Sequence, residues 1–125
     1  MILDTNGLSA LAEGEPALES VLREAEKVAV PVIVLGEYRY GILQSRYRKH
    51  YEQWLSEYLS GFRILDVDER TTVAYSAVRT ELKKAGTPIP SNDVWIAALC
   101  RQHSLPLLSR DRHFDVVPGI TRLEW

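Results

Sequence analysis

The sequence has almost no cysteine, and this shortage excludes two classes of small protein. Cys100 is the single cysteine among 125 residues, so no disulfide can form within the chain. Zinc sites built from paired cysteines are excluded for the same reason. A reducing, cytoplasmic location is therefore the default expectation.

Long hydrophobic runs are also missing. The longest apolar runs cover residues 28–36 and 94–100, well short of the roughly 20 residues that a membrane-spanning helix needs. Asp4 interrupts the apolar start of the chain, which argues against a signal peptide. We expect no membrane segment.

A marked excess of charge of one sign is missing as well. Lys and Arg number 15 against 17 Asp and Glu, which gives a net charge of −2. Domains that bind nucleic acid by phosphate neutralisation alone usually carry a basic excess, so this value argues weakly against that mode of binding. If four of the acidic residues hold metal ions, however, the rest of the chain carries +2, and the bound cations attract phosphate. Net charge therefore leaves nucleic-acid binding open.

Internal repeats, low-complexity tracts and Gly/Ser linkers are absent too, so residues 1–125 are expected to form a single domain. Apolar runs indicate short strands at 1–3, 28–30, 62–67, 106–109 and 120–125. Helical spacing predicts helices just after Asp4 and over 16–27, 32–44, 47–59, 68–85 and 93–103. This alternation predicts an α/β fold, with a central parallel sheet of four to five short strands and helices on both faces. Such sheets place their functional sites beyond the carboxyl ends of the strands, at a topological switch.

Three acidic residues stand where such a sheet would gather them. Asp4 follows the first strand, Asp93 opens an apolar helix, and Asp111 follows the strand at 106–109. Each has an ordinary alternative. Asp4 can form a turn with Asn6, Asp93 and the two residues before it are all potential helix caps, and Asp111 can be a loop acid between two arginines.

Glu37 is different because it lies within a predicted helix, on a largely apolar face. One alternative to a functional role is that Glu37 is simply a charged residue at the edge of a buried apolar stripe of the helix. Gly41, one turn later, favours a functional role, because glycine inside a helix costs about 1 kcal/mol relative to alanine. The missing side chain there is expected to allow close approach of a neighbouring strand or a ligand.

These four carboxylates together indicate a metal site. Carboxylate oxygens are the hard ligands that Mg²⁺ and Mn²⁺ prefer, and several converging acids rarely share a site without cations. Two such cations would polarise a phosphodiester, generate a hydroxide and stabilise the leaving oxygen. The pattern therefore favours phosphoryl chemistry.

The four acids stand in the segments Leu-Asp-Thr-Asn at 3–6, Gly-Glu-Tyr-Arg-Tyr-Gly at 36–41, Asn-Asp-Val-Trp-Ile-Ala-Ala at 92–98 and Ser-Arg-Asp-Arg-His-Phe at 109–114. In order and spacing these segments resemble the acidic motifs of PIN-domain ribonucleases, and among these the VapC toxins most closely. The resemblance implies a three-layer α/β/α fold and Mg²⁺- or Mn²⁺-dependent cleavage of RNA by a metal-activated water. It also implies a homodimer that is inhibited by a cognate VapB-type antitoxin.

The resemblance also assigns residues. The catalytic and metal-binding acids correspond to Asp4, Glu37, Asp93 and Asp111, with Asp115 as a rival for the fourth position. Residues expected to contact substrate are Asn6 and Ser109, which match motif positions, and Arg110 and Arg112, because they flank Asp111. Ser109 stands where the family commonly has threonine, an exchange that keeps the hydroxyl.

Several features have an ordinary interpretation. His113 lies in a charged segment and is expected to be solvated, so it is left out of the catalytic set. The basic and aromatic stretch at 46–51 is expected to be a solvated helix face rather than an RNA-binding surface. Trp54, Tyr58 and Trp125 belong either to a dimer or antitoxin surface or to the core.

Two other functions remain as alternatives. One is a different metal-dependent nuclease or a phosphatase, because carboxylate clusters serve any phosphoryl chemistry. The segment 4–6 lacks the second aspartate that haloacid-dehalogenase phosphatases place two residues after their nucleophile. The other alternative is a non-catalytic module that keeps the fold and binds RNA or a protein.

Overall fold

A five-stranded parallel sheet lies at the centre of the protein. The computed structural model describes residues 1–25 and 27–125. Its strands are β1 (Ile2–Leu3), β2 (Ala29–Pro31), β3 (Arg63–Leu65), β4 (Leu107–Leu108) and β5 (Arg122–Leu123). They are arranged in the order β3-β2-β1-β4-β5, and every neighbouring pair is parallel.

Six α-helices connect the strands in the described part of the chain. They are α1 (Thr5–Ala12), α2 (Pro16–Arg23), α3 (Val32–Gln44), α4 (Arg48–Tyr58), α5 (Glu69–Ala85) and α6 (Ser91–His103). Two short 3-10 helices, Leu59–Gly61 and Arg112–Val116, complete the order. Among the described residues, no helix is long and apolar enough to cross a membrane.

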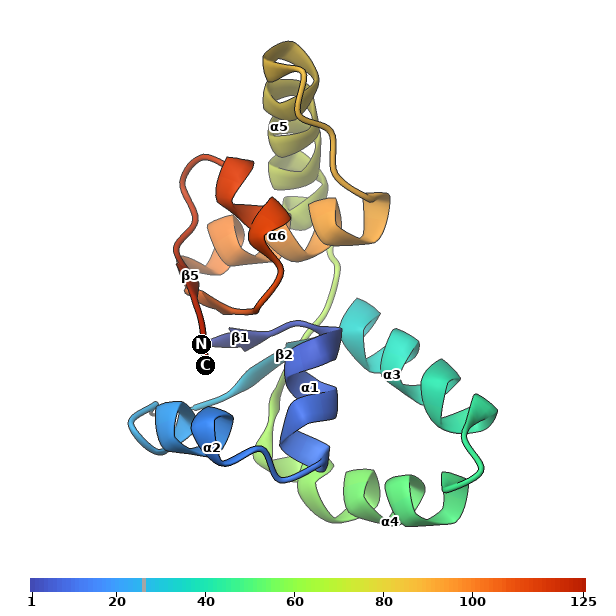
Figure 1. Ribbon diagram of the computed structural model, residues 1–125. Helices are drawn as coiled ribbons and strands as arrows, with labels where there is room; N and C mark the ends of the chain where they lie inside the picture. The colour runs from blue at the N-terminus through green and yellow to red at the C-terminus, as the bar shows by residue number, and fades with distance from the viewer. Residues whose placement is uncertain (26) are drawn as a thin grey trace.

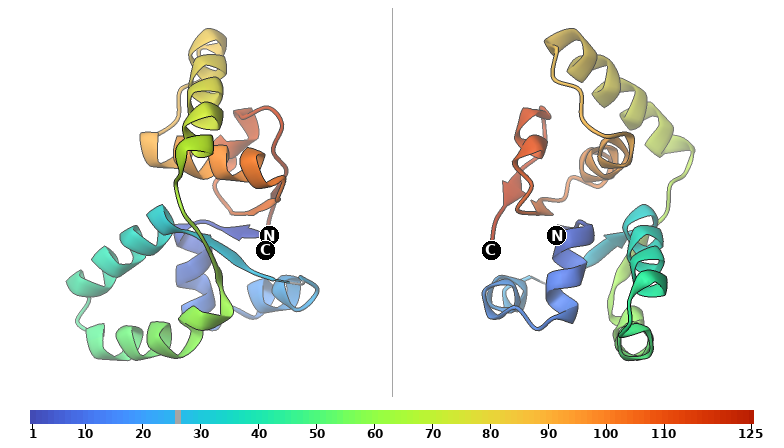
Figure 2. Two further views of the ribbon diagram at one scale, coloured as in Figure 1. Left: turned by 180° about the vertical axis from the view of Figure 1, so that it is seen from behind. Right: turned by 45° about the vertical axis from the view of Figure 1, so that its right-hand side comes forward.

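The helices form a layer on each side of the sheet. Figures 1 and 2 show α5 and α6 on one side, with α1, α2 and α4 on the other. Successive side chains on a strand point to opposite faces, so neighbouring strand residues join different clusters. Leu3 and Leu108 pack with Leu18 of α2, whereas Ile2 and Leu107 belong to the main cluster, which includes Ile96 and Leu99 of α6 together with Leu8 of α1. The predicted three-layer α/β/α fold is confirmed.

The strand order reverses direction at β1. The chain runs from β1 outward to β2 and β3 on one side, and β4 and β5 then extend the sheet on the other side. The switch point therefore lies between β1 and β4, where Ile2 pairs with Leu107 and Leu3 with Leu108. Asp4 and Ser109 follow these paired residues directly, so they emerge side by side at the carboxyl edge of the sheet.

Several predicted boundaries are correct because local chemistry determines them. The predicted helix at 32–44 is α3. Helix α5 begins after Asp68, whose side chain accepts a hydrogen bond from the backbone of Thr71 in a capping box, and it ends at Gly86. Gly86 has φ 70°, a left-handed conformation that glycine adopts without steric cost.

Other boundaries differ from the prediction. Helix α2 ends at Arg23 rather than at 27, because the chain must turn there to enter β2. The predicted end was too late because the sequence has no helix stop signal at this point. Glu26, which falls within the predicted range, lies outside the described residues. The strands predicted at 62–67, 106–109 and 120–125 are shorter, at two or three residues each. Pairing with a neighbouring strand sets their length, and an apolar run alone does not determine that pairing.

Candidate active site

Asp4 is a buried carboxylate between β1 and α1. It caps α1, because its Oδ1 accepts a hydrogen bond of 2.7 Å from the backbone N–H of Gly7. Its Oδ2 accepts a hydrogen bond of 2.5 Å from Ser109 Oγ. Burial raises the pKa of Asp4, the two hydrogen bonds oppose that shift, and the charge of Asp111 adds to it. The residue is 5% exposed, so its negative charge is held at the edge of the core.

Ser109 connects the first acidic segment with the last. Its backbone N–H donates to Leu123 O in β5, which fixes the residue in the sheet edge. Its Oγ donates to Asp4 and accepts a hydrogen bond of 3.0 Å from the backbone N–H of Asp111. Ser109 is fully buried, so its hydroxyl does not face solvent but holds the carboxylate of Asp4 and the backbone of Asp111.

Glu37 reaches the same edge from α3. Its two carboxylate oxygens accept hydrogen bonds of 2.5 Å from Thr5 Oγ1 and 2.5 Å from Asn92 Nδ2. Thr5 follows Asp4 in the chain, and Asn92 precedes Asp93. The carboxylate of Glu37 is therefore held between the first turns of α1 and α6, beside two of the other acids.

Gly41 does not have the packing role that was predicted for it. A Cβ atom at this position would meet nothing within 4 Å, so the expected close approach of a neighbouring strand is wrong. The glycine instead lines a cavity of about 280 Å³ between α1, α3 and α4, which Thr5 and Glu37 also line. Of the four predicted acids, Glu37 alone lines this cavity.

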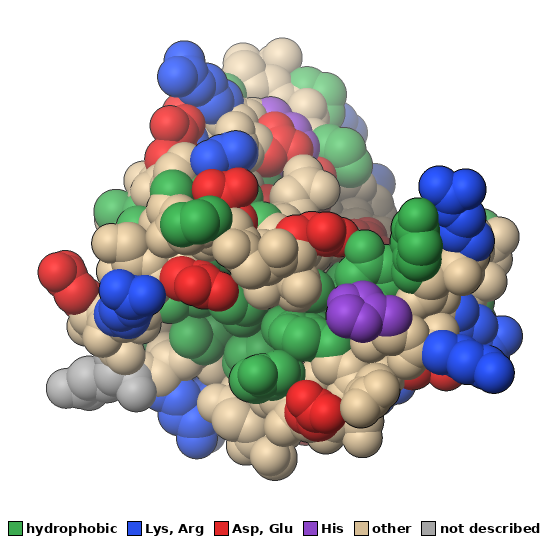
Figure 3. Space-filling model, turned by 60° about the horizontal axis from the view of Figure 1, so that its bottom comes forward, with side chains coloured by type: hydrophobic (Ala, Val, Ile, Leu, Met, Phe, Trp, Pro, Cys, Tyr) green, Lys and Arg blue, Asp and Glu red, His purple; other side chains and the backbone are tan. Residues whose placement is uncertain are grey.

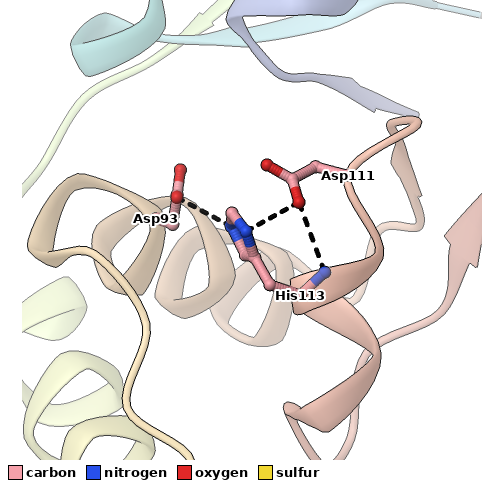
Figure 4. A group of neighbouring side chains, drawn as sticks. All are labelled: Asp93, Asp111 and His113. Atoms are coloured by element: carbon pink, nitrogen blue, oxygen red, sulfur yellow. Dashed lines mark hydrogen bonds and ion pairs between the residues drawn. The ribbon is translucent and has the colours of Figure 1, made fainter.

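Asp93, Asp111 and His113 form a compact cluster (Figure 4). His113 Nε2 lies 2.8 Å from Asp93 Oδ2, and His113 Nδ1 lies 2.6 Å from Asp111 Oδ1. Burial raises the pKa of Asp93, the adjacent His113 opposes this shift, and the charges of Asp111 and Glu37 add to it. The influence of Asp111 on both Asp4 and Asp93 indicates that the carboxylates share one electrostatic environment.

The local structure at Asp93 excludes its ordinary alternative. Helix α6 begins at Ser91, after Pro90, and no side chain caps it. Asn92 donates to Glu37 and Asp93 contacts His113, so these potential caps serve the cluster instead. An acid in the first turn is still favoured by the helix dipole.

His113 is the residue that the sequence analysis missed. It was expected in a solvated loop, but only 31% of its side chain is exposed and its ring lies between two carboxylates. The sequence carries one weak signal for this, namely its position two residues after Asp111, at the start of a 3-10 helix that Asp111 caps. The partner on α6 is invisible at the level of sequence.

The remaining predicted residues lie outside the cluster. Asp115, the rival fourth acid, forms a two-point ion pair of 2.7 and 3.0 Å with Arg122, which lowers its pKa. Arg110 donates to the backbone oxygen of Trp125 and stacks over that ring. Arg112 and Asn6 are exposed, and the Arg112 side chain, 79% exposed, has a 3.5 Å contact with Glu124.

The donor set fits a divalent cation. One ligand atom from each of Asp93, Asp111 and His113 lies within 4.8 Å of the others, and Asp4 and Glu37 are linked to this group through Ser109 and Asn92. Partly buried carboxylates at this spacing repel one another, and a cation relieves that repulsion. Carboxylate oxygens are ligands that Mg²⁺ and Mn²⁺ prefer. An imidazole nitrogen is a ligand for transition-metal ions.

Comparisons with known proteins agree with this fold and site. The PIN domain matches residues 1–120, and the chain belongs to the PIN-domain family. Within that family its relatives include VapC ribonucleases. It is 30% identical over 127 residues to ribonuclease VapC2 of Haemophilus influenzae, an alignment that covers 99% of this chain and 96% of the relative. It is 28% identical over 125 residues to ribonuclease VapC5 of Mycobacterium tuberculosis, covering 98% and 91% respectively.

A solved structure supports the same relationship. The complex of VapBC2 from Rickettsia felis with a DNA fragment from its promoter contains a chain that superimposes on this protein with a TM-score of 0.89. The two chains are 26% identical, and the alignment covers 99% of this chain and 97% of the other. The resemblance to PIN-domain ribonucleases of the VapC kind is thus confirmed.

Proposed function

We propose that this protein is a metal-dependent endoribonuclease that acts as the toxin of a VapBC-type pair. The observation that carries the proposal is the linked set of carboxylates at the switch point of the sheet. The Ser109 hydroxyl donates to Asp4 and accepts the backbone N–H of Asp111, while Glu37 accepts hydrogen bonds from Thr5 and Asn92, the neighbours of Asp4 and Asp93. Such a costly concentration of negative charge is explained by the binding of cations.

In this proposal Asp4, Glu37, Asp93 and Asp111 hold Mg²⁺ or Mn²⁺. When bound, the cation supplies positive charge at the phosphodiester and lowers the pKa of a bound water. Ser109, Thr5 and Asn92 hold the carboxylates in position through the hydrogen bonds described above. Arg112 is exposed beside the cluster and is the basic residue best placed to meet an RNA phosphate.

The partners in this proposal are an RNA substrate, a VapB-type antitoxin and a second copy of the chain, acting in the cytoplasm. Helices α3 and α4 and their connection expose large apolar side chains, at Tyr40 (67%), Leu43 (52%), Tyr47 (55%) and Tyr58 (53%). Figure 3 shows hydrophobic side chains gathered on the face where α4 lies. Trp54, by contrast, packs against the main core cluster, and Trp125 packs on the cluster around Leu3. Exposed apolar surface of this kind supports contact with another protein.

Cleavage of a mixed RNA panel tests the proposal. Purified, antitoxin-free protein is incubated with Mg²⁺, Mn²⁺ or EDTA, beside Asp4→Ala as a control for contaminating nucleases. We expect metal-dependent cutting that disappears in EDTA and in the variant. Asp93→Asn, which keeps the shape of the side chain but binds Mg²⁺ poorly, should also lose activity while remaining folded.

The same assay separates the alternatives. Single-stranded DNA, duplex DNA and a small phosphate ester are offered in parallel with RNA. Preferential hydrolysis of DNA or of the ester would replace the ribonuclease proposal with another phosphoryl hydrolase. Normal RNA cleavage by a folded Asp93→Asn protein would refute the assigned site.

A further inference from the structure

The ring of His113 lies in an arrangement that the four-carboxylate site does not explain. Its two nitrogens face different carboxylates, with Nε2 2.8 Å from Asp93 Oδ2 and Nδ1 2.6 Å from Asp111 Oδ1. Nε2 is shielded from solvent, yet it makes no hydrogen bond of acceptable geometry with any residue that the structure describes. A buried polar atom without a partner is costly, so this nitrogen calls for a ligand.

The chemistry of imidazole limits which kinds of ligand Nε2 can bind. A neutral ring carries one N–H and one bare nitrogen. If Nδ1 bears the hydrogen toward Asp111, the lone pair of Nε2 faces the negative oxygen of Asp93. Two electron-rich atoms at this distance repel unless a proton or a metal ion lies between them. Because the contact does not have the geometry of a hydrogen bond, a metal ion suits it better than a proton.

The distance itself suits joint coordination. Two neighbouring ligands on an octahedral ion with bonds of about 2.1 Å lie about 3.0 Å apart. The separation of 2.8 Å between Nε2 and Asp93 Oδ2 is close to that value. At this distance the lone pairs of Nε2 and Oδ2 would repel each other if nothing lay between them. The same distance suits two ligands of one metal ion.

We propose that His113 Nε2 is a direct ligand of the cation that Asp93 binds, and that Asp111 Oδ1 orients the ring from the opposite side. A carboxylate that holds the second nitrogen of a metal-binding histidine fixes the orientation of the ring and raises its basicity. The backbone N–H of His113 also donates to Asp111 Oδ1, at 3.3 Å, which stabilises this geometry. The other oxygen of Asp111 remains available to the cation.

A nitrogen ligand changes which metal the site prefers. Mg²⁺ strongly favours oxygen ligands and gives up its waters reluctantly, whereas Mn²⁺, although the weakest binder of the first-row divalent series, accepts nitrogen ligands more readily. His113 therefore makes this site selective for Mn²⁺ over Mg²⁺. The inference rests on the metal site of the proposed function, but it does not depend on whether the substrate is RNA.

Pulsed electron paramagnetic resonance tests the inference directly. The intact protein is labelled with ¹⁵N only at histidine, freed of metal with a chelator and loaded with one equivalent of Mn²⁺. We expect an ¹⁵N hyperfine coupling to Mn²⁺ of the size seen for a bound imidazole. The coupling should vanish in His113→Gln and persist in His50→Gln, since His50 is an exposed residue of α4.

Calorimetric titration supplies the second measurement. We expect His113→Gln to weaken Mn²⁺ binding on the order of 10- to 100-fold and to affect Mg²⁺ binding much less. Mn²⁺ bound without histidine coupling would overturn the inference and leave the ribonuclease proposal intact. In that case the imidazole is a cationic bridge between Asp93 and Asp111. The labelled wild-type protein gives this answer even if the variant fails to fold, and absence of Mn²⁺ binding would overturn the inference and the metal site together.

Discussion

Ser109 donates a 2.5 Å hydrogen bond to Asp4 across a sequence separation of 105 residues. The bond exists because β1 and β4 are parallel neighbours, so that the residues following them emerge at the same edge of the sheet. The same oxygen of Ser109 accepts the backbone N–H of Asp111. One buried hydroxyl thus sets the positions of the first and the last acidic residue.

Ser109→Ala should impair both stability and metal binding. The change leaves the buried carboxylate of Asp4 without one of its two donors, and an unsatisfied buried polar group costs about 1–3 kcal/mol. Denaturant unfolding and Mn²⁺ titration measure the two effects. Ser109→Thr is the matched control, because it keeps the hydroxyl and should retain most of the metal affinity. Equal behaviour of the two variants would mean that the hydroxyl is not what positions Asp4.

Gly7→Ala should disturb Asp4 from the opposite side. A Cβ at Gly7 would lie 3.1 Å from Asp4 Oδ1, 3.1 Å from Leu3 Cδ2 and 3.4 Å from Leu108 O, so the carboxylate must shift. We expect a clear loss of metal affinity and cleavage. Gly36→Ala is the control, because a Cβ there meets nothing within 4 Å, and it should stabilise α3 by about 0.5–1 kcal/mol. Unchanged metal binding by Gly7→Ala would contradict the tight packing around Asp4.

Thr5→Val should reduce activity through Glu37. The substitution removes the hydroxyl that donates to Glu37 Oε2 while keeping a branched side chain of similar size. Loss of a group that orients a metal ligand typically costs 10- to 100-fold in affinity or activity, and we expect a decrease of about that size. Thr80→Val on the exposed face of α5 controls for the loss of a threonine hydroxyl. The assignment of Thr5 as a positioning residue fails if both variants cleave equally well.

Protonation of Asp4 and Asp93 should stabilise the metal-free protein as the pH falls toward their raised pKa values, whereas His103, whose pKa burial lowers, acts in the opposite sense. Burial raises the pKa of both Asp4 and Asp93 above the ordinary value of 3.8, so the folded state binds protons more readily than the unfolded state. This stabilisation is present at low pH and is lost as the pH rises through the raised pKa values. Groups such as Asp68, whose pKa the Thr71 backbone N–H lowers, act in the opposite sense at still lower pH.

Thermal melts in EDTA measure this dependence. The melting temperature should rise as the pH approaches the raised pKa values of Asp4 and Asp93 and fall again in strong acid. Saturating Mn²⁺ should reverse the first slope, because the cation stabilises the charged carboxylates. A melting temperature in EDTA that only falls as the pH decreases would show that the buried carboxylates do not govern stability in this range.

Local chemistry made a large part of the fold predictable. Helix α3 starts after Pro31, and α5 is bounded by Asp68 and Gly86, all signals that act within a few residues. Where such signals are weak, as at the end of α2, the prediction was wrong. Strand lengths were overestimated for a related reason, since hydrogen bonding to a neighbouring strand determines where pairing stops.

The sequence by itself determined the alternation of elements and the four acidic segments, because periodicity, caps and motif spacing are properties of neighbouring residues. Only the tertiary structure decided which side chains serve those acids. Ser109 meets Asp4, and His113 meets Asp93 from across the gap between α6 and the 3-10 helix that follows β4. Such contacts depend on strand order and on the packing of helices against the sheet. The sequence places His113 two residues after Asp111, but nothing in it indicated that Asp93 of α6 would lie on the other side of the ring.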